Sequence, residues 1–505
     1  MKLRQSRQWL LPTLCILIAF TVSSQTTQAG PDPIEVGPGV HLFVDDYLVE
    51  KMTQVWRSLN IGRKHAKNPL LKPDRPWEGY LVLQPGTVIW DEEDQIFKMW
   101  YNTIGTRERP NVEDFLCYAT SKDGITWEKP DLGLIEFQGS KANNIFLKWS
   151  GWTHSVLKDK RDPDPSRRYK LLYWLTHERE QCGIWVAFSP DGKRWTNYAE
   201  KAIVPCWATG DTFDVTQHPE TGQFILYHKT IGGPIRKVSR MVSDDFIHWR
   251  DSQEVLAPDK HDPPDTQFYG LSAFPYGNQF LGLLWVYHTY THFMDMQLVS
   301  SRDGIEWERS ADRKLFLHLA TTNNLKDDAF DNGMVYPSSN PIVKDGKVWI
   351  YYSGFTNLHN APSEDHDGQI GLATIRQDGF LSVDATSEGS VQTRRLKLSG
   401  SSLWVNMSSL TGSRPNFERD SGKEPYSEFY TDNPSAKGYV RVEVQDRDGR
   451  VLPGYEAANC SPLMGTDIYQ KVSWEGGRDL SAVAGREIRL RFVLGNAKLY
   501  SFKLE

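Results

Sequence analysis

The sequence has few cysteines and none of the short signatures that assign a chemistry directly. Five cysteines occur in 505 residues, none of them in a Cys-x-x-Cys pair, so a disulfide framework is not expected, although an individual disulfide can form. A Gly-rich phosphate loop, an H-E-x-x-H helix and a G-x-S-x-G nucleophile turn are also absent. These absences argue against nucleotide-binding enzymes, zinc proteases of this type and serine hydrolases.

An excess of positive charge is lacking as well. The formal net charge is −6, and a mildly acidic protein is a poor partner for a nucleic-acid backbone. After the first 29 residues, no stretch is long and apolar enough to cross a bilayer. The chain is therefore expected to bind no nucleic acid and, once processed, no membrane.

The N-terminus has the three-part pattern of a secretory signal peptide. Lys2, Arg4 and Arg7 precede an apolar run from Trp9 to Val22, and small and polar residues then lead to Ala29. The apolar run has about 14 residues, short of the roughly 20 that a spanning helix needs. We expect residues 1–29 to be removed and the protein to be secreted or periplasmic; the alternative is an N-terminal anchor helix.

What the sequence does contain is a repeat. The phrase Ser-x-Asp-Gly-x-x-Trp begins at Ser121, Ser189 and Ser301; a variant with Phe in place of Gly begins at Ser243, and a degenerate copy surrounds Asp378. Asp-Gly favours a tight turn because glycine accepts positive φ and aspartate bonds its own backbone. The tryptophan is expected to pack on a neighbouring sheet, so each copy predicts a hairpin turn between outer strands.

An aromatic strand, another turn and another apolar strand precede each copy, and no long stretch shows helical periodicity. Four strands per unit and five units of about 60 residues predict a five-bladed β-propeller over residues 30–388. A β-sandwich with fortuitous turns is the alternative. In residues 389–505 the repeat is absent, and apolar and polar residues alternate as they do in β-strands. This pattern predicts a separate β-sandwich that either binds carbohydrate or packs on the propeller.

The innermost strands of a propeller converge on one axis, so polar residues at their entry ends are the candidate site. Each also has a structural reading, as a turn, cap or loop residue. The carboxylates that we predict to be catalytic are Glu78, Asp211, Asp265 and Asp331. The residues that we predict to bind substrate are Trp77, His154, Asp214, Gln267, Tyr269 and Tyr336. Asp328 lies in the same loop as Asp331, and the pair Asp45-Asp46 is expected to close the ring or a turn.

Carboxylates gathered at one funnel are costly unless they are used, paired or bound to a cation. Like charges in proximity raise one pKa, which leaves one acid and one base or nucleophile, the pair that glycoside hydrolysis requires. A separation of about 5 Å would retain configuration and one of about 6.5–9.5 Å would invert it. No cofactor is predicted; a calcium ion would suit the acidic ring, but no further feature supports one.

Several phrases resemble the five-bladed propeller glycosidases of the superfamily of glycoside hydrolase families 32 and 43, most of all exported planctomycete-type proteins described as family-32-like. The matching phrases span residues 44–50, 68–71, 76–78, 99–101, 118–124, 129–136 and 139–144. The W-M-N-D-P-N-G and E-C motifs of family 32 are absent. Its second motif, R-D-P, occurs only in a turn at residues 161–163. The resemblance therefore implies the superfamily plan but transfers neither fructan cleavage nor catalytic residues.

Together these features predict a secreted glycosidase that cuts a glycosidic bond of an unnamed carbohydrate with a carboxylate pair. Two alternatives remain open. A sialidase-like enzyme would need three arginines and a phosphorolytic one a basic phosphate pocket, and neither is evident in the sequence. The other alternative is a propeller that binds carbohydrate without catalysis.

Overall fold

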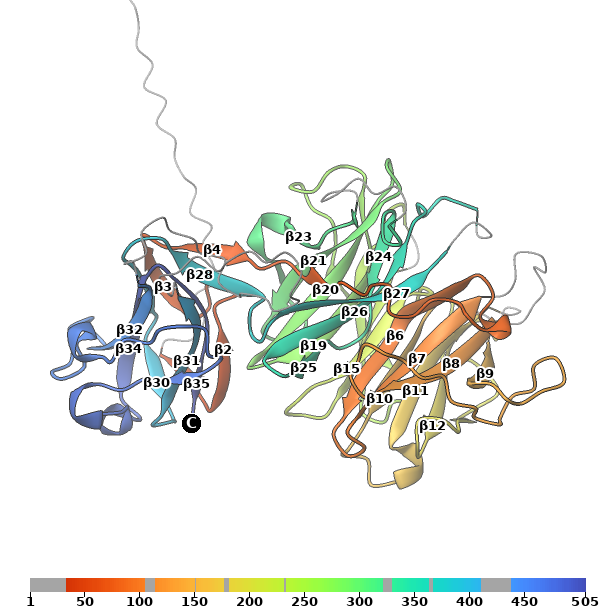
Figure 1. Ribbon diagram of the computed structural model, residues 1–505, viewed down its shortest axis with the longest axis horizontal. Helices are drawn as coiled ribbons and strands as arrows, with labels where there is room; N and C mark the ends of the chain where they lie inside the picture. Colours follow the sequence, from red (N-terminus) through yellow and green to blue (C-terminus); the bar gives the residue numbers. More distant parts are fainter. Residues whose placement is uncertain are drawn as a thin grey trace, which may run out of the picture.

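The computed structural model describes residues 33–104, 114–149, 151–176, 181–230, 233–320, 329–362, 367–409 and 437–505. The predicted signal peptide, residues 1–29, and Asp328 lie outside these ranges. Within them the chain is all β, as expected: β-sheets form two groups, seen to the right and the left of Figure 1. The described helices are single 3-10 turns, none of which could span a membrane. They are η1 (Pro76–Glu78), η2 (Pro165–Arg167), η3 (Ala311–Arg313), η6 (Ala457–Asn459), η7 (Glu475–Gly477) and η8 (Ser481–Val483).

The larger group consists of antiparallel meanders in which most strands pair with the next along the chain. The first contains β6 (Leu81–Asp91), β7 (Ile96–Ile104), β8 (Asp114–Ser121) and β9 (Ile145–Trp149). The second contains β10 (His154–Lys158), β11 (Tyr169–Leu175), β12 (Gly183–Ser189), β13 (Thr196–Asn197) and β14 (Val204–Pro205). The third contains β15 (Phe213–Gln217), β16 (Phe224–Lys229), β17 (Val238–Ser243) and β18 (Arg250–Leu256).

A ten-stranded sheet contains two further meanders, which the pairing of Met294 with Met334 joins into one sheet. The fourth meander contains β19 (Thr266–Tyr276), β20 (Gln279–His288), β21 (Met294–Ser301), β22 (Trp307–Arg309) and β23 (Leu315–Leu317). The fifth contains β24 (Met334–Pro337), β25 (Ile342–Lys344), β26 (Lys347–Phe355) and β27 (Gln369–Arg376). Its outer strand is β5 (Arg63–Lys64), which pairs with β27. The Asp45-Asp46 segment is not part of this sheet; Asp45 accepts the amide of Tyr47 at 3.1 Å, in agreement with the alternative that this pair closes a turn.

The first strands of the meanders lie side by side around one centre. The amide of Val156 in β10 donates to Thr87 Oγ1 in β6 at 2.8 Å. The hydroxyl of Ser155 in β10 donates to Asp214 in β15, also at 2.8 Å, and lies 3.3 Å from the hydroxyl of Ser339, just after β24. Because these bonds join β6, β10, β15 and the end of β24, the entry ends of the first strands share one face of the molecule.

The repeated turn phrase forms the local structure that its residues predict. Asp123 Oδ1 accepts the amides of Ile125 and Thr126, and Gly124 has a φ of 71°. The carbonyl oxygens of the turn glycines accept hydrogen bonds from aromatic side chains of the neighbouring meander. The donor and acceptor pairs are Tyr351 with Gly124, Trp100 with Gly192, and Tyr227 with Gly304. The repeat therefore holds adjacent meanders together, a structural and not a catalytic role.

Tyr351→Phe is expected to destabilise the protein by about 1–2 kcal/mol, because the buried carbonyl of Gly124 would lose its donor. Urea unfolding would measure the change. Tyr198→Phe is the matched control, because the side chain of Tyr198 is 49% exposed. Loss of its hydroxyl should change the free energy of unfolding by less than about 0.5 kcal/mol. Equal effects of the two substitutions would contradict this role for the turn.

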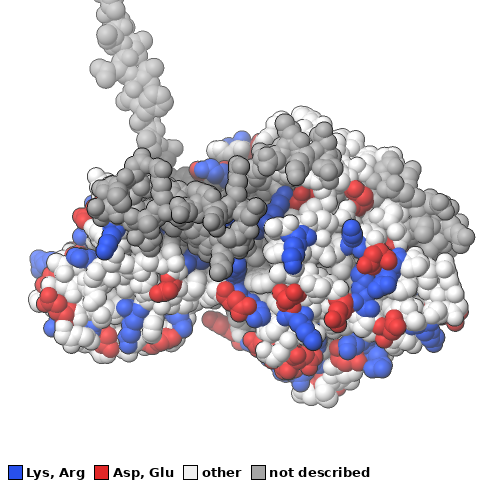
Figure 2. Space-filling view, in the orientation of Figure 1, with Lys and Arg blue, Asp and Glu red and all other residues white. Residues whose placement is uncertain are grey.

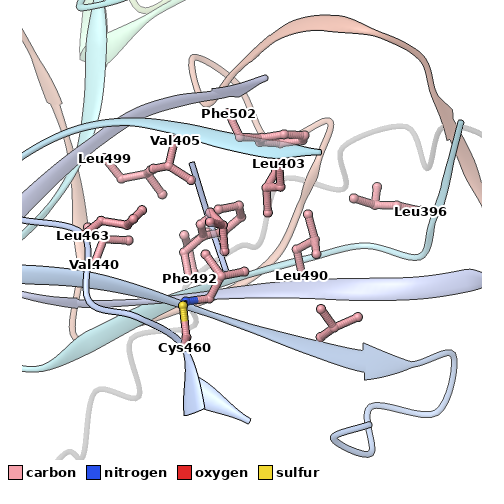
Figure 3. Packing of buried hydrophobic residues seen from close by; sticks show 14 of the residues in the cluster. Leu396, Leu403, Val405, Val440, Cys460, Leu463, Leu490, Phe492, Leu499 and Phe502 are labelled. Atoms are coloured by element: carbon pink, nitrogen blue, oxygen red, sulfur yellow. The ribbon is translucent and has the colours of Figure 1, made fainter. Parts of the chain in front are cut away.

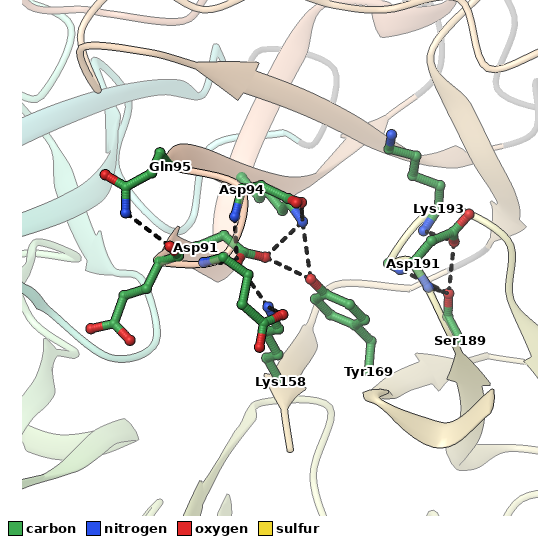
Figure 4. A network of polar contacts seen from close by, with 12 residues as sticks. Asp91, Asp94, Gln95, Lys158, Tyr169, Ser189, Asp191 and Lys193 are labelled. Atoms are coloured by element: carbon green, nitrogen blue, oxygen red, sulfur yellow. Dashed lines mark hydrogen bonds and ion pairs between the residues drawn. The ribbon is translucent and has the colours of Figure 1, made fainter. Parts of the chain in front are cut away.

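Polar contacts also join the first and second meanders at the end remote from the entry face (Figure 4). Asp91, the last residue of β6, accepts hydrogen bonds from Lys98, Lys158 and Tyr169. Desolvation opposes the ionised form of Asp91, but these three donors outweigh it and hold its pKa well below the usual value. Asp91 is therefore a structural carboxylate.

The smaller group consists of two six-stranded sheets that enclose one apolar cluster, in which Phe492, Phe502 and Leu499 lie close together (Figure 3). One sheet contains β1 (Ile34–Val36), β3 (Val49–Thr53), β29 (Gly389–Thr393), β30 (Leu396–Leu398), β32 (Tyr439–Asp446) and β34 (Glu487–Gly495). The other contains β2 (Gly39–Leu42), β4 (Trp56–Leu59), β28 (Leu381–Ala385), β31 (Leu403–Ser409), β33 (Gln470–Lys471) and β35 (Ala497–Leu504).

This pairing differs from the boundaries of 30–388 and 389–505 read from the sequence. Strands β1 to β4, within residues 34–59, pair with C-terminal strands, and so does β28 (Figure 1). Asp45 does not lie on a strand; it forms an ion pair with Arg302 at 2.6 Å between the two groups of sheets. The N-terminal strands carry no repeat phrase, and pairing across more than 300 residues leaves no local sequence signal.

The face shown in Figure 2 has Lys and Arg side chains interspersed with Asp and Glu over both groups of sheets. Many charged side chains of the described residues are paired, as in Lys158 with Glu93 at 2.7 Å. A mixed surface of this kind gives no long-range field of one sign that would attract a polyanion to this face.

Candidate active site

A pocket of about 220 Å³ lies at the entry ends of the first strands. Every one of the five meanders contributes to its wall, which fits the convergence expected from the sequence. Aromatic side chains make up much of this wall, with few polar groups, the usual composition of a small-molecule site. The lining residues are Leu83, Trp152, Thr153, Asp211, Thr212, Tyr269, Trp285, Tyr336, Phe355, His359 and Ala361.

One wall of the pocket is a stack of rings. Trp285 and Tyr336 are parallel, with centroids 5.3 Å apart and an interplanar angle of 5°. Phe355 packs against Tyr336 at 5.1 Å, and the hydroxyl of Tyr336 is directed to the sulfur of Met334. Trp152, which is 38% exposed, also lines the pocket. Flat, rigid faces of this kind can receive the apolar face of a sugar ring.

The charged part of the pocket is the ion pair of Asp211 and Lys229. Lys229 Nζ lies 2.5 Å from Asp211 Oδ1 and 4.1 Å from the centroid of the Tyr269 ring. The side chain of Asp211 is 35% exposed, whereas that of Lys229 is 11% exposed. The carboxylate is therefore open to a ligand, while the ammonium is held between Asp211 and Tyr269.

A histidine completes the polar set. His359 Nε2 lies 3.0 Å from the Tyr269 hydroxyl, and the backbone amide of His359 donates to the carbonyl of His292. Arg236 lies over the Tyr269 ring with its guanidinium carbon 5.4 Å from the centroid. A carboxylate, an ammonium, a phenol and an imidazole are thus gathered on one side of the pocket, and such groups can move protons at a bound ligand.

Of the predicted site residues, the structure brings Asp211, Tyr269 and Tyr336 together in the pocket. Gln267 lies near them and accepts a hydrogen bond from Arg236. The predicted pair of catalytic carboxylates is not assembled among the described lining residues, because Asp211 is the one carboxylate there. The described part of the chain also holds no group of three or more His, Cys, Asp or Glu side chains suited to a metal ion.

Glu78 lies outside the pocket and is fully buried. Its carboxylate accepts a hydrogen bond from the Tyr101 hydroxyl at 2.7 Å and forms an ion pair with Lys129 at 2.6 Å. Trp77 donates to Asn144 in the same region. Both residues hold the 3-10 turn η1 against β7, which is a structural role.

Asp265 and Asp331 are also engaged locally. Asp331 is 2% exposed, accepts a hydrogen bond from Tyr352 at 2.7 Å, and pairs with Lys64 of β5 at 2.6 Å, so it anchors the strand that completes the ring. Asp265 is 9% exposed and accepts the backbone amide of Tyr290. Neither carboxylate lines the pocket.

His154 and Asp214 lie at the centre of the ring, where both are buried. His154 Nε2 donates to the carbonyl of Trp100, and burial lowers the pKa of His154 to about 4. The imidazole ring of His154 packs directly against Gly86. A residue with a side chain at position 86 would place its Cβ 2.2 Å from His154 Nε2, so glycine is required there. Burial raises the pKa of Asp214 to about 7, although Ser339, Ser155 and the Val215 amide favour the ionised form. Neither residue lines the pocket, so substrate contact is not their role in this geometry.

Several residues that line the pocket or lie beside it were missed because they are on second strands. Lys229 and Phe355 are the last residues of β16 and β26, and Trp285 is near the end of β20. In an antiparallel meander the second strand ends where the first begins, so its last residues reach the same face. A search of the last residues of the second strands, in addition to the entry ends of the first strands, would have found these residues.

Comparison with known proteins gives structural likeness but no family. No protein-family model matches the chain, and no curated protein does. The described fold is similar to a glycosyl hydrolase from Bacteroides ovatus, with 16% identity and a TM-score of 0.42, covering 63% of this chain and 94% of that one. It is also similar to a structure from work on the family 130 mannoside phosphorylases and β-1,2-mannoside hydrolases, with 14% identity and a TM-score of 0.42, covering 63% and 94%.

A third similar structure is a fructofuranosidase variant from Schwanniomyces occidentalis with bound fructosylnystose. The identity is 11% and the TM-score 0.40, with 86% of this chain and 96% of that chain covered. Glycoside hydrolases are thus among the structures that this chain resembles. The particular family stays a prediction, and likeness at this level assigns no activity to the chain.

Proposed function

We propose that the five meanders are the blades of a β-propeller and that the two remaining sheets form a β-sandwich. The proposal is supported by the shared strand order of the meanders, by the hydrogen bonds around their common centre, and by β5 as the outer strand of the last one. The sandwich would include residues 34–59 together with the C-terminal strands. Export through the signal peptide at residues 1–29 is part of the same proposal.

We further propose that the protein is a glycosidase that acts in the pocket. The observation that carries the proposal is a partly exposed carboxylate, Asp211, which is paired with Lys229 and lines the same pocket as the stacked rings of Trp285 and Tyr336. The rings would hold the apolar face of a sugar, and the carboxylate would face its polar edge. This is the composition that a carbohydrate site needs, with broad apolar contact and few directed polar groups.

In the proposed mechanism Asp211 supplies negative charge beside the oxocarbenium-like transition state, or activates the attacking water. Lys229 keeps this carboxylate oriented. The proton for the leaving oxygen would come from the hydrogen-bonded pair of Tyr269 and His359, since both side-chain types can act as general acids. This replaces the pair of carboxylates expected from the sequence with a single carboxylate and a Tyr–His pair.

A second candidate function is carbohydrate binding without turnover. It is favoured by one observation: Asp211 is the one carboxylate among the described lining residues, whereas most glycosidases use two. The rings and the ion pair would then serve affinity and orientation alone.

Asp211→Asn is expected to lower turnover by at least about 100-fold while saccharide affinity changes only a few-fold, because the amide keeps the shape but not the charge. The wild-type protein would first be screened against aryl glycosides and plant and marine polysaccharides, and the best hit followed by rate assays and calorimetry. Asp345→Asn is the control, because Asp345 is exposed in the turn before β26. Binding without any turnover, weakened in steps by substitutions in the pocket, would support the second candidate and contradict the first.

A further inference from the structure

Two cysteines face each other across the edge of the second meander. Strands β12 and β14 are antiparallel, with Gly183 opposite Pro205 and Ile184 opposite Val204. One further step in this register places Cys182 opposite Cys206, and the amide of Cys206 donates to the carbonyl of Cys182 at 3.0 Å. The two residues are therefore direct cross-strand partners, although 24 positions separate them in the sequence.

The spacing of such partners suits a disulfide. Directly opposed residues in antiparallel strands have Cα atoms about 4.5–5.5 Å apart, within the range of about 4.4–6.8 Å found for disulfides. Their side chains also lie on the same face of the sheet. Here both side chains are partly buried against the same apolar cluster, which includes Ile184 and Val204.

We propose that Cys182 and Cys206 form a disulfide when the protein meets an oxidising compartment. The step is a thiol–disulfide exchange with a low-molecular-weight disulfide such as oxidised glutathione. One cysteine thiolate displaces a glutathione thiol to give a mixed disulfide, and the second cysteine displaces the other. The two protein thiols lose two electrons and two protons, and glutathione disulfide is reduced to two thiols.

The remaining described cysteines have no such partner in reach. Cys117 lies in the core of the first meander and Cys460 in the core of the C-terminal sheets, and both are at most 2% exposed. Burial also raises the pKa of both thiols, which lowers their thiolate content. Oxidation should therefore be confined to the Cys182–Cys206 pair.

The position of the bond would matter to the pocket. Cys206 begins the short segment that leads to Asp211, and the amide of Gly210 in this segment donates to the carbonyl of Lys229 at 2.8 Å. The disulfide would fix one end of the segment to β12, while the Gly210 bond fixes the other to β16. The proposal concerns the fold alone, so it stands whether or not the pocket proves to be catalytic.

The test is a peptide map of the full chain without reduction, after exposure to oxidised glutathione and alkylation of the remaining thiols. The expected result is one linked peptide pair that joins Cys182 to Cys206, with Cys117 and Cys460 recovered as alkylated thiols. Alkylated Cys182 and Cys206, or separate glutathione adducts on both, would overturn the proposal.

A matched variant gives a second readout. In Cys206→Ser no linked pair can form, so oxidised glutathione should leave its urea midpoint unchanged, whereas the midpoint of the wild-type protein should rise on oxidation and fall again with dithiothreitol. Cys182→Ser should behave in the same way as Cys206→Ser. An equal shift in the wild-type protein and both variants would show that the effect does not arise from this pair.

Discussion

Asp214→Asn is expected to make the protein more resistant to urea at pH 8 than the wild type, and by a smaller margin at pH 5. Asp214 is 4% exposed at the centre of the ring, and burial raises its pKa to about 7. An amide has the same shape, can still accept the hydrogen bond from Ser155, and carries no charge at either pH.

The sign of this pH-dependent change in stability follows from the protons that the folded and unfolded states bind. The pKa of Asp214 is higher in the folded protein than in the unfolded chain, so its contribution to stability is complete below about pH 4 and is lost as the pH rises toward 7. Three pKa units correspond to about 4 kcal/mol, and the part lost between pH 5 and pH 8 to about 3 kcal/mol. The Asn variant escapes this loss.

Urea unfolding of both proteins at the two pH values measures the effect. Asp345→Asn serves as the control, because it makes the same change of carboxylate to amide on an exposed side chain. If the difference in urea stability between Asp214→Asn and the wild type were the same at pH 5 and pH 8, the raised pKa of Asp214 in the folded protein would be contradicted.

Lys129→Met is expected to destabilise the protein by about 3–5 kcal/mol, the typical cost of removing one partner of a buried ion pair. Lys129 Nζ lies 2.6 Å from Glu78 and 2.7 Å from Asp74, and its side chain is 5% exposed. Its loss would leave the fully buried carboxylate of Glu78 without a cation. Urea unfolding would give the value.

Adding Glu78→Gln to Lys129→Met should restore most of the lost stability, because the amide removes the uncompensated charge. The single variant Glu78→Gln also separates a structural role from the catalytic role predicted from the sequence. If it folded with normal stability but lost turnover, Glu78 would be catalytic and its placement outside the pocket would not explain the activity.

The repeat made most of the larger group of sheets predictable. Ser-x-Asp-Gly-x-x-Trp fixes a local turn through bonds between neighbours, such as Asp123 with the amides of Ile125 and Thr126. Signals of this kind are contained in a few consecutive residues, so they can be recognised without knowledge of the tertiary fold. The second-strand aromatics were recognisable for the same reason, since an aromatic strand, such as that of Trp100 or Tyr351, precedes each copy of the turn.

The site was only partly predictable, because position along a strand does not fix the direction of a side chain. Asp211 and Asp214 are three residues apart, yet one faces the pocket and the other is buried among serines of neighbouring first strands. Asp331 and Glu78 also occur near strand entries, but lysines from distant segments, Lys64 and Lys129, bind them. No local sequence pattern predicts partners that lie so far away in the sequence.

The pairing of strands at residues 34–59 with the C-terminal sheets was likewise beyond local analysis. The pairing of β4 with β28 joins Leu59 to Leu381, and that of β2 with β35 joins Leu42 to Ser501. Each strand reads as an ordinary short strand, whereas Leu42, Leu59 and Leu381 pack in or against one apolar cluster that also includes residues of the fourth and fifth meanders.

The central claim is that a sugar binds over the stacked rings and against residue 211. The most direct test is a crystal structure of the Asp211→Asn variant with the best saccharide from the screen. The account predicts a sugar ring on Trp285 and Tyr336, with a hydroxyl or the glycosidic oxygen within about 3.2 Å of the side chain at position 211. A saccharide bound only to the C-terminal sheets, with the pocket occupied by water, would contradict it.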